Sequence, residues 1–185
     1  VLGRNHGTVM IAEESTAWPQ VTGKAEDNGL GFSLKWNMGW MNDFLEYMKL
    51  DPYFRKGDHN KMTFSMTYAY SEKYVLVISH DEVVHLKCSM LNKMPGQPED
   101  KIRNLKAAYA FMLFHPGKKL LFMGQEFGQL REWSEERELD WYLLNEEPHQ
   151  DIQNFVKALL HMYTKYPALY GGDGDPGCFE WINAD

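Results

Sequence analysis

Residues 75–85 read VLVISHDEVVH, so that two histidines and two carboxylates directly follow an apolar run. Asp81 and Glu82 come immediately after His80, and His85 stands three positions further on. Side chains of these types are compatible with three arrangements. They could form a metal site, a catalytic carboxylate site, or a polar loop whose members bond only to one another.

The histidine spacing argues against a metal site. A zinc site of the H-E-x-x-H type needs two histidines four positions apart on one face of a helix. His80 and His85 are five positions apart, which separates them by about 140° around a helix. They also follow a strand-like run instead of a helical pattern. We therefore expect no metal in this chain and no metal-dependent catalysis.

A second acidic pair strengthens the carboxylate hypothesis. Glu13 and Glu14 end another apolar run, at residues 8–14. If the two runs are parallel strands of one sheet, Glu13 and Asp81 reach the same rim. Glycoside chemistry needs a protonated acid, which burial can provide, and an ionised carboxylate opposite an oxocarbenium-like charge. A His–Asp pair that merely satisfies itself at a strand end remains the alternative.

Four apolar runs predict buried strands, and polar residues follow each of them. The runs lie at residues 8–14, 29–37, 74–82 and 118–127. Three helical patterns with apolar stripes lie between and after them, whereas the period of residues 60–72 is ambiguous. The stripes contain Trp40, Met41, Phe44, Leu45 and Met48; Ile102, Leu105, Ala108, Tyr109 and Met112; and Ile152, Phe155, Val156, Leu159 and Leu160.

Strands that alternate with helices predict an α/β fold with a parallel sheet. No glycine-rich phosphate loop follows any of the runs, which argues against a nucleotide-binding doubly wound sheet. Polar residues at the carboxyl ends of the strands are typical of the catalytic rim of a (β/α)8 TIM barrel. A full barrel takes about 250 residues, and this chain has 185. With four strand–helix units, we expect half of such a barrel.

The composition excludes several functional classes. The chain has 19 basic and 26 acidic residues, so a nucleic-acid partner, which requires basic surface, is not expected. Cys88 and Cys178 stand far apart, which predicts no disulfide framework and a reducing, cytoplasmic location. No apolar run predicts a membrane span or a signal peptide. Both ends stop in strand-like runs, so we expect a piece of a larger protein.

Five segments together resemble the 1,4-α-glucan branching enzymes of glycogen synthesis, within the α-amylase family of glycoside hydrolases. They read MIAEEST, GLGFSLKWNMGWMNDFLEYM, VISHDEVVH, KKLLFMGQEFGQLREW and LDWYLL, and the resemblance runs over essentially the whole chain. It implies that residues 1–170 are the C-terminal half of the (β/α)8 catalytic domain, with strands five to eight. Residues 171–185 would be a linker and the first strand of a C-terminal β-domain.

The resemblance also implies roles for single residues. Glu13 matches the general acid/base of the family, Asp81 the carboxylate that stabilises the transition state, and His80 a ligand of sugar hydroxyls. The nucleophile of these retaining enzymes is an Asp in a G-F-R-x-D segment, which the chain does not contain. Leu86 departs from the family, which usually has Gly there. The mechanism implies no cofactor.

Aromatic residues supply candidate sugar contacts. Trp18, Trp36 and Trp133 follow strand ends, whereas the aromatic residues on the helical stripes are expected in the core. The expected partner is an α-1,4-glucan of the glycogen type. An α-amylase-type hydrolase, a debranching enzyme and a non-catalytic glucan-binding fragment remain alternatives. We expect the isolated chain to be inactive and to self-associate through open sheet edges.

Overall fold

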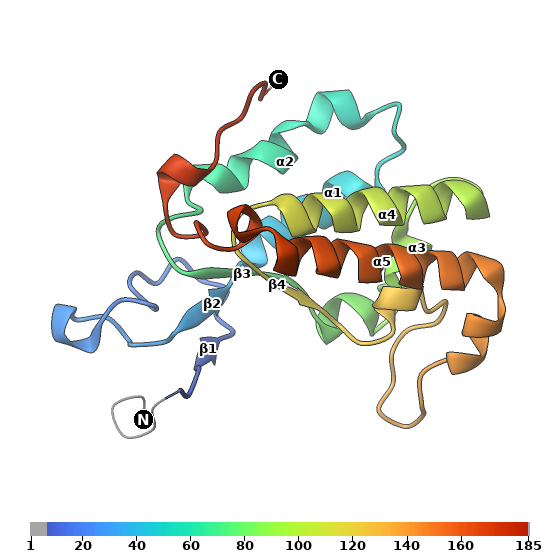
Figure 1. Ribbon diagram of the computed structural model, residues 1–185, viewed down its shortest axis with the longest axis horizontal. Coiled ribbons are helices and arrows are strands. Elements are labelled where there is room, and N and C mark those ends of the chain that lie inside the picture. Colours follow the sequence, from blue (N-terminus) through green and yellow to red (C-terminus); the bar gives the residue numbers. More distant parts are fainter. Residues whose placement is uncertain (1–6, 185) are drawn as a thin grey trace.

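The computed structural model describes residues 7–184, which form one parallel sheet flanked by helices (Figure 1). The strands are β1 (Ile11–Ala12), β2 (Leu34–Trp36), β3 (Tyr74–Ile78) and β4 (Lys118–Leu121), and their order in the sheet is their order in the chain. A doubly wound sheet reverses its strand order at a switch point, whereas neighbouring strands of a (β/α)8 barrel follow one another. The predicted parallel α/β fold is confirmed, and it is compatible with part of a barrel.

Three long helices match the three helical patterns of the sequence. They are α1 (Met38–Lys49), α4 (Pro98–Phe114) and α5 (Glu147–Lys165), with α4 and α5 packed side by side (Figure 1). The ambiguous segment is helical, because α2 (Asn60–Thr63) continues into a 3-10 turn, and α3 (Met90–Lys93) precedes α4. No helix within residues 7–184 is long and apolar enough to cross a membrane. The 3-10 turns span Ala25–Asp27, Arg55–Asp58, Phe64–Thr67, His80–Val83, Gln125–Phe127, Trp141–Asn145, Pro167–Leu169 and Pro176–Cys178.

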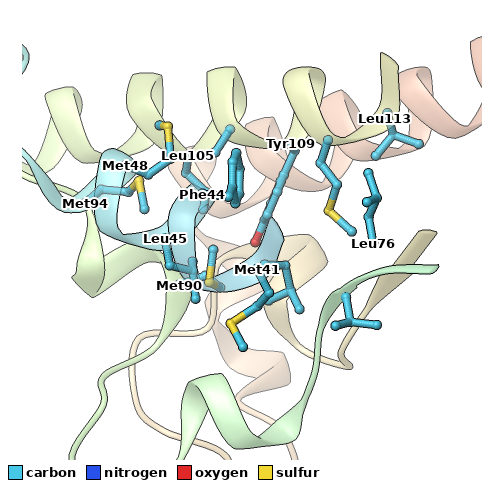
Figure 2. Close-up of a cluster of buried hydrophobic side chains, with 14 of the residues drawn as sticks. Met41, Phe44, Leu45, Met48, Leu76, Met90, Met94, Leu105, Tyr109 and Leu113 are labelled. Carbon is cyan, nitrogen blue, oxygen red and sulfur yellow. The ribbon is translucent and has the colours of Figure 1, made fainter. Parts of the chain in front are cut away.

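The core lies between β3 and the helices. Leu76 of β3 lies below Tyr109 and Leu113 of α4, and α1 contributes Phe44 and Met41 to the same cluster (Figure 2). All five predicted stripe residues of α1 are buried, as are four of the five on α4. Burial of such side chains supplies the main favourable free energy of folding.

Two expectations about helices were wrong in detail. Leu160 is 50% exposed, because α5 turns Ile152, Val156 and Leu159 toward the core and the next residue lies about 100° further round the helix. The first strand is followed by no α-helix: residues 13–33 hold a loop with a single 3-10 turn. The described chain therefore has three strand–helix units instead of four.

The prediction of four buried strands holds fully only for β3. Val75 to Ile78 are at most 3% exposed, since this strand has neighbours on both sides and helices above it. Ile11 is 45% exposed because β1 is the edge of the described sheet, and Lys35 occupies a buried position of β2. Residues 179–184 form no strand, so the predicted first strand of a β-domain is not seen.

Leu105, where sequence and structure agree, and Leu160, where they differ, give a direct test of the core. Leu105→Ala should lower the free energy of unfolding by about 2–5 kcal/mol, because Leu105 is fully buried and its removal leaves a cavity. The matched variant Leu160→Ala should cost about 0.5 kcal/mol or less, as expected at an exposed position. Urea denaturation monitored by circular dichroism measures both. Equal losses would contradict the orientation of α5.

Candidate active site

The carboxyl ends of the strands carry the residues that the sequence singled out. Glu13 directly follows β1, and His80 and Asp81 follow β3 after a single Ser79. Because the strands are parallel, their carboxyl ends lie at the same rim of the sheet, with β2 between β1 and β3. The assembly of Glu13 and Asp81 into one catalytic site stays a prediction, which the placement of their strands supports.

Glu14 is committed to a structural ion pair. Its Oε2 lies 2.7 Å from Nζ of Lys35, whose side chain is 5% exposed, and Oε1 accepts a hydrogen bond of 2.7 Å from the Thr16 N–H. The Lys35 ammonium, followed by Thr16, lowers the pKa of the Glu14 carboxyl to about 2. A carboxyl that is ionised at all physiological pH values cannot serve as a general acid. Of the two adjacent acids, only Glu13 remains available for that role.

Strand register separates the two acids further. Ala12 pairs with Lys35 in the parallel ladder, and successive side chains of a strand point to opposite faces. Glu14 therefore shares the face of Lys35, as their ion pair requires. The same alternation, continued past Ala12, places Glu13 on the opposite face. Glu13 is exposed, and no hydrogen bond or ion pair involves it within the described part of the chain.

Glu82 and Asp81 likewise differ in their contacts and exposure. Glu82 is 5% exposed, and its Oε2 accepts hydrogen bonds of 2.7 Å from both the N–H and the Oγ–H of Ser79. This capping box begins the 3-10 turn His80–Val83. Asp81 has a side chain that is 47% exposed, and His80 Nε2 stands 3.8 Å from its Oδ1. Glu82 thus builds the turn, and Asp81 is presented by it.

His80 is linked to Trp133 through a residue that the sequence analysis missed. Phe122 directly follows β4, and its ring centroid lies 6.0 Å from that of His80 and 5.2 Å from that of Trp133. The N–H of Phe122 also donates to the carbonyl of Ile78, which joins the ends of β3 and β4. Phe122 lies inside the apolar run predicted at residues 118–127, and only the end of β4 at Leu121 shows that it follows the strand.

The other two predicted sugar contacts lie elsewhere along the rim. Trp18, which is 61% exposed, and Trp36 line a pocket of about 500 Å³ at the end of β2, together with Glu14 and Tyr68. Asp81, His80 and Trp133 do not line this pocket. The predicted site residues therefore form two groups, one around β2 and one around the ends of β3 and β4.

The described residues offer no ready metal site. Between residues 7 and 184, no three His, Cys, Asp or Glu side chains gather closely enough to hold a metal ion. Cys88 and Cys178 are both exposed and free.

The amino-acid sequence of the chain was compared with those of known proteins. No protein-family model matches the chain. A 1,4-alpha-glucan branching enzyme, GlgB, of Butyrivibrio fibrisolvens is 62% identical over 185 residues, which are 100% of this chain and 29% of the relative. The chain is homologous to part of the 1,4-alpha-glucan branching enzymes. The resemblance carried by the five segments is thereby confirmed.

Two further branching enzymes show the same partial coverage. The GlgB of Geobacillus stearothermophilus is 55% identical over 175 residues, 95% of this chain and 27% of the relative. That of Leifsonia xyli subsp. xyli is 54% identical over 180 residues, 97% of this chain and 25% of the relative. The chain thus spans between a quarter and three tenths of the length of these branching enzymes.

The Glu14–Lys35 pair can be tested by titration. In Lys35→Met, we expect the pKa of the Glu14 carboxyl to rise from about 2 toward its ordinary value, because the ammonium that lowers it is gone. In the unmodified chain, the pair stabilises the fold above the unfolded-state pKa, and this contribution is lost as the pH falls toward 2. Carboxyl carbon NMR shifts measure the titration. The control Lys24→Met removes an exposed lysine from Glu26 and should leave Glu14 unchanged. Ordinary titration of Glu14 in the unmodified chain would contradict the pair.

Proposed function

We propose that this chain is the C-terminal half of the catalytic (β/α)8 domain of a 1,4-α-glucan branching enzyme. Its strands would be strands five to eight, within residues 1–170, and residues 171–185 would lead into a C-terminal β-domain. The observation that carries the proposal is the state of the two acidic pairs. Glu14 and Glu82 are held by structural partners, which leaves Glu13 and Asp81 for chemistry at the ends of two strands of one sheet.

The proposed reaction moves a glucan segment from an α-1,4 to an α-1,6 link. Glu13, protonated, donates its proton to the glycosidic oxygen, while a carboxylate nucleophile attacks the anomeric carbon and the old C–O bond breaks. Glu13, now ionised, takes the proton from the 6-hydroxyl of an acceptor chain, whose oxygen displaces the nucleophile. Two inversions retain the anomeric configuration. The nucleophile must come from outside residues 1–185, because the chain contains no G-F-R-x-D segment.

Asp81 and the residues around it would act on the positive charge that develops at the anomeric carbon. A carboxylate opposite an oxocarbenium-like centre lowers the energy of the transition state. His80, half-exposed beside Asp81, would donate hydrogen bonds to hydroxyls of the same sugar. Trp36, Trp18 and Trp133 would contact the apolar faces of glucose units. The partner is an α-1,4-glucan, no cofactor takes part, and the location is cytoplasmic.

A chimera supplies the complete enzyme for testing. In it, this chain replaces the matching segment of the Butyrivibrio fibrisolvens branching enzyme, to which it is 62% identical over its full length. In this chimera, Glu13→Gln should reduce branching by about 10²-fold or more, because Gln cannot transfer a proton. Iodine staining of amylose reports branching, and affinity electrophoresis in glycogen should show retained binding.

The adjacent acid provides the matched control. In the same chimera, Glu14→Gln should lower thermal stability by weakening the pair with Lys35, yet branch at least tenfold faster than Glu13→Gln, since Glu14 is not the acid. If Glu13→Gln branched normally and Glu14→Gln did not, the acid would have to be reassigned. If the unmodified chimera were inactive, the proposed function itself would fail.

The exposed edge of the sheet predicts self-association of the isolated chain. Ile11 of β1 is 45% exposed, and the preceding Val9 and Met10 are 61% and 38% exposed. In the described part of the chain, β1 pairs only with β2. Unpaired edges with apolar side chains drive association. Light scattering should therefore detect oligomers of the purified chain, and Ile11→Lys should reduce them. Met162→Lys, at a 42% exposed position on α5, is the control. A stable monomer of the unmodified chain would contradict this account.

A further inference from the structure

The segment that joins the Asp81 turn to α3 is held in an unfavourable backbone conformation. His85, Leu86 and Cys88 have φ angles of 55°, 65° and 66°, in the left-handed region that non-glycine residues avoid. Leu86 is 95% exposed, so packing of its side chain does not compensate. Strain of this kind persists only where surrounding groups impose it, and it clusters at functional sites.

One side chain imposes much of this conformation. Glu132, on the loop after β4, accepts a hydrogen bond of 2.7 Å from the Cys88 N–H and one of 3.0 Å from the Leu86 N–H. Its two oxygens thus bind alternate amides of the strained segment, 44 and 46 residues away in sequence. The Cys88 N–H is the first cause of a lowered pKa of the Glu132 carboxyl, so the acceptor is ionised at neutral pH.

The carbonyl groups of the same segment are bound from another direction. Lys93 of α3 donates a hydrogen bond of 2.8 Å from Nζ to the Cys88 carbonyl, and a second to the carbonyl of Lys87. Burial lowers the pKa of Lys93 to about 8. The Leu86 and Cys88 amides are therefore bound by a carboxylate, and the Lys87 and Cys88 carbonyls by an ammonium from a different part of the chain, which leaves this exposed segment little freedom.

Trp133, the residue after Glu132, contacts the turn that presents Asp81 and, through Phe122, is linked to His80. The Trp133 N–H donates a hydrogen bond of 3.0 Å to the carbonyl of Val83, the last residue of the turn that presents Asp81. The Trp133 ring packs edge-on against Phe122, whose ring faces His80. Two consecutive residues thus contact the backbone on the C-terminal side of Asp81 and, through Phe122, the histidine on its N-terminal side.

We propose that Glu132 is a positioning residue of the active site. By binding the Leu86 and Cys88 amides, it fixes the segment that follows Asp81 and so orients the Asp81 carboxylate and the His80 ring for the sugar. This inference rests on the proposed function, and it adds a residue that touches neither substrate nor reacting atoms. A merely structural Glu132 would change stability alone, whereas a positioning residue changes turnover in a folded protein.

Hydrogen exchange on the isolated chain tests the contact without any activity. In Glu132→Gln, one of the two acceptor oxygens becomes an NH2 group, so exchange at the Leu86 or Cys88 amide should accelerate by about tenfold. Amides of α4 should exchange as before. Glu135→Gln, at an exposed glutamate of the same loop, is the matched control and should change neither. Unchanged exchange at both amides in Glu132→Gln would overturn the proposal.

Titration of the unmodified chain provides a second measurement, should the variant fold poorly. Because the folded-state pKa of Glu132 is lowered, its hydrogen bonds persist through the ordinary carboxyl range and are lost only as the pH falls below it. The amide proton shifts of Leu86 and Cys88 should therefore change together, with one midpoint below the ordinary glutamate range. Amide shifts of Leu86 and Cys88 that do not change as Glu132 titrates would also overturn the proposal.

Kinetics in the Butyrivibrio chimera test the consequence for catalysis. Glu132→Gln should lower kcat by about tenfold or more, as expected when a catalytic group is misplaced, with KM changed by less than about twofold. In a His80→Ala background the further loss should be smaller than in the unmodified background, because both changes act through the same turn. Glu135→Gln should retain full activity.

The outcomes separate this inference from the function on which it rests. An active chimera whose kcat is unaffected by Glu132→Gln would overturn the positioning role and leave the proposed function intact. Fully additive losses with His80→Ala would do the same. An inactive unmodified chimera would overturn the proposed function and the catalytic role of Glu132 together.

Discussion

The burial of β3 is the constraint on which the rest of the structure depends. Four of its five residues, Val75 to Ile78, are almost inaccessible to solvent, with β2 and β4 paired on either side. Leu76 packs below α4, next to Gly117 in the turn into β4. At Gly117 φ is +111°, and a Cβ would lie 3.4 Å from the Tyr74 carbonyl oxygen. A strand fixed on both edges and one face delivers its next residues to a defined place, and those residues are Ser79, His80 and Asp81.

Local hydrogen bonding then decides which acids are free. In both acidic pairs the second acid is bound by structural partners. Glu14 forms an ion pair with a buried lysine, and Glu82 accepts the hydrogen bonds that cap a 3-10 turn. The first member of each pair is left half-exposed or exposed beside it. An acidic dipeptide at a strand end can therefore serve two purposes, because one carboxylate anchors the backbone that presents the other. The pairing is electrostatic at β1 and a backbone cap at β3, so the same outcome has two physical causes.

Sequence patterns predicted those parts of the fold that follow from local periodicity. The apolar stripe of α1 follows from a period of 3.6, and the strand-end positions of Glu13 and Asp81 follow from short apolar runs that end in polar residues. The parallel class of the sheet follows from the alternation of strands with helices. Leu160 and Ile11 were misjudged because their burial depends on which elements lie opposite, and periodicity carries no such information. Glu132 could not be found either, since its partners are backbone amides 44 and 46 residues away, with no side-chain signature.

The position of Glu13 gives the proposed function a structural requirement. A general acid must carry a proton near neutral pH, and enzymes achieve this by removing the carboxyl from water or by placing another carboxylate nearby. Glu13 is exposed and ends an edge strand whose preceding residues Val9, Met10 and Ile11 present apolar side chains to solvent. A strand paired with β1 would cover those side chains and desolvate Glu13 at once. If that strand also carried the nucleophile at its carboxyl end, the attacking carboxylate would lie beside Glu13 at the same rim. Closing the sheet edge and completing the acid–nucleophile pair would then be one structural event, so the edge that we expect to drive association of the isolated chain would also be the edge that completes the proposed active site.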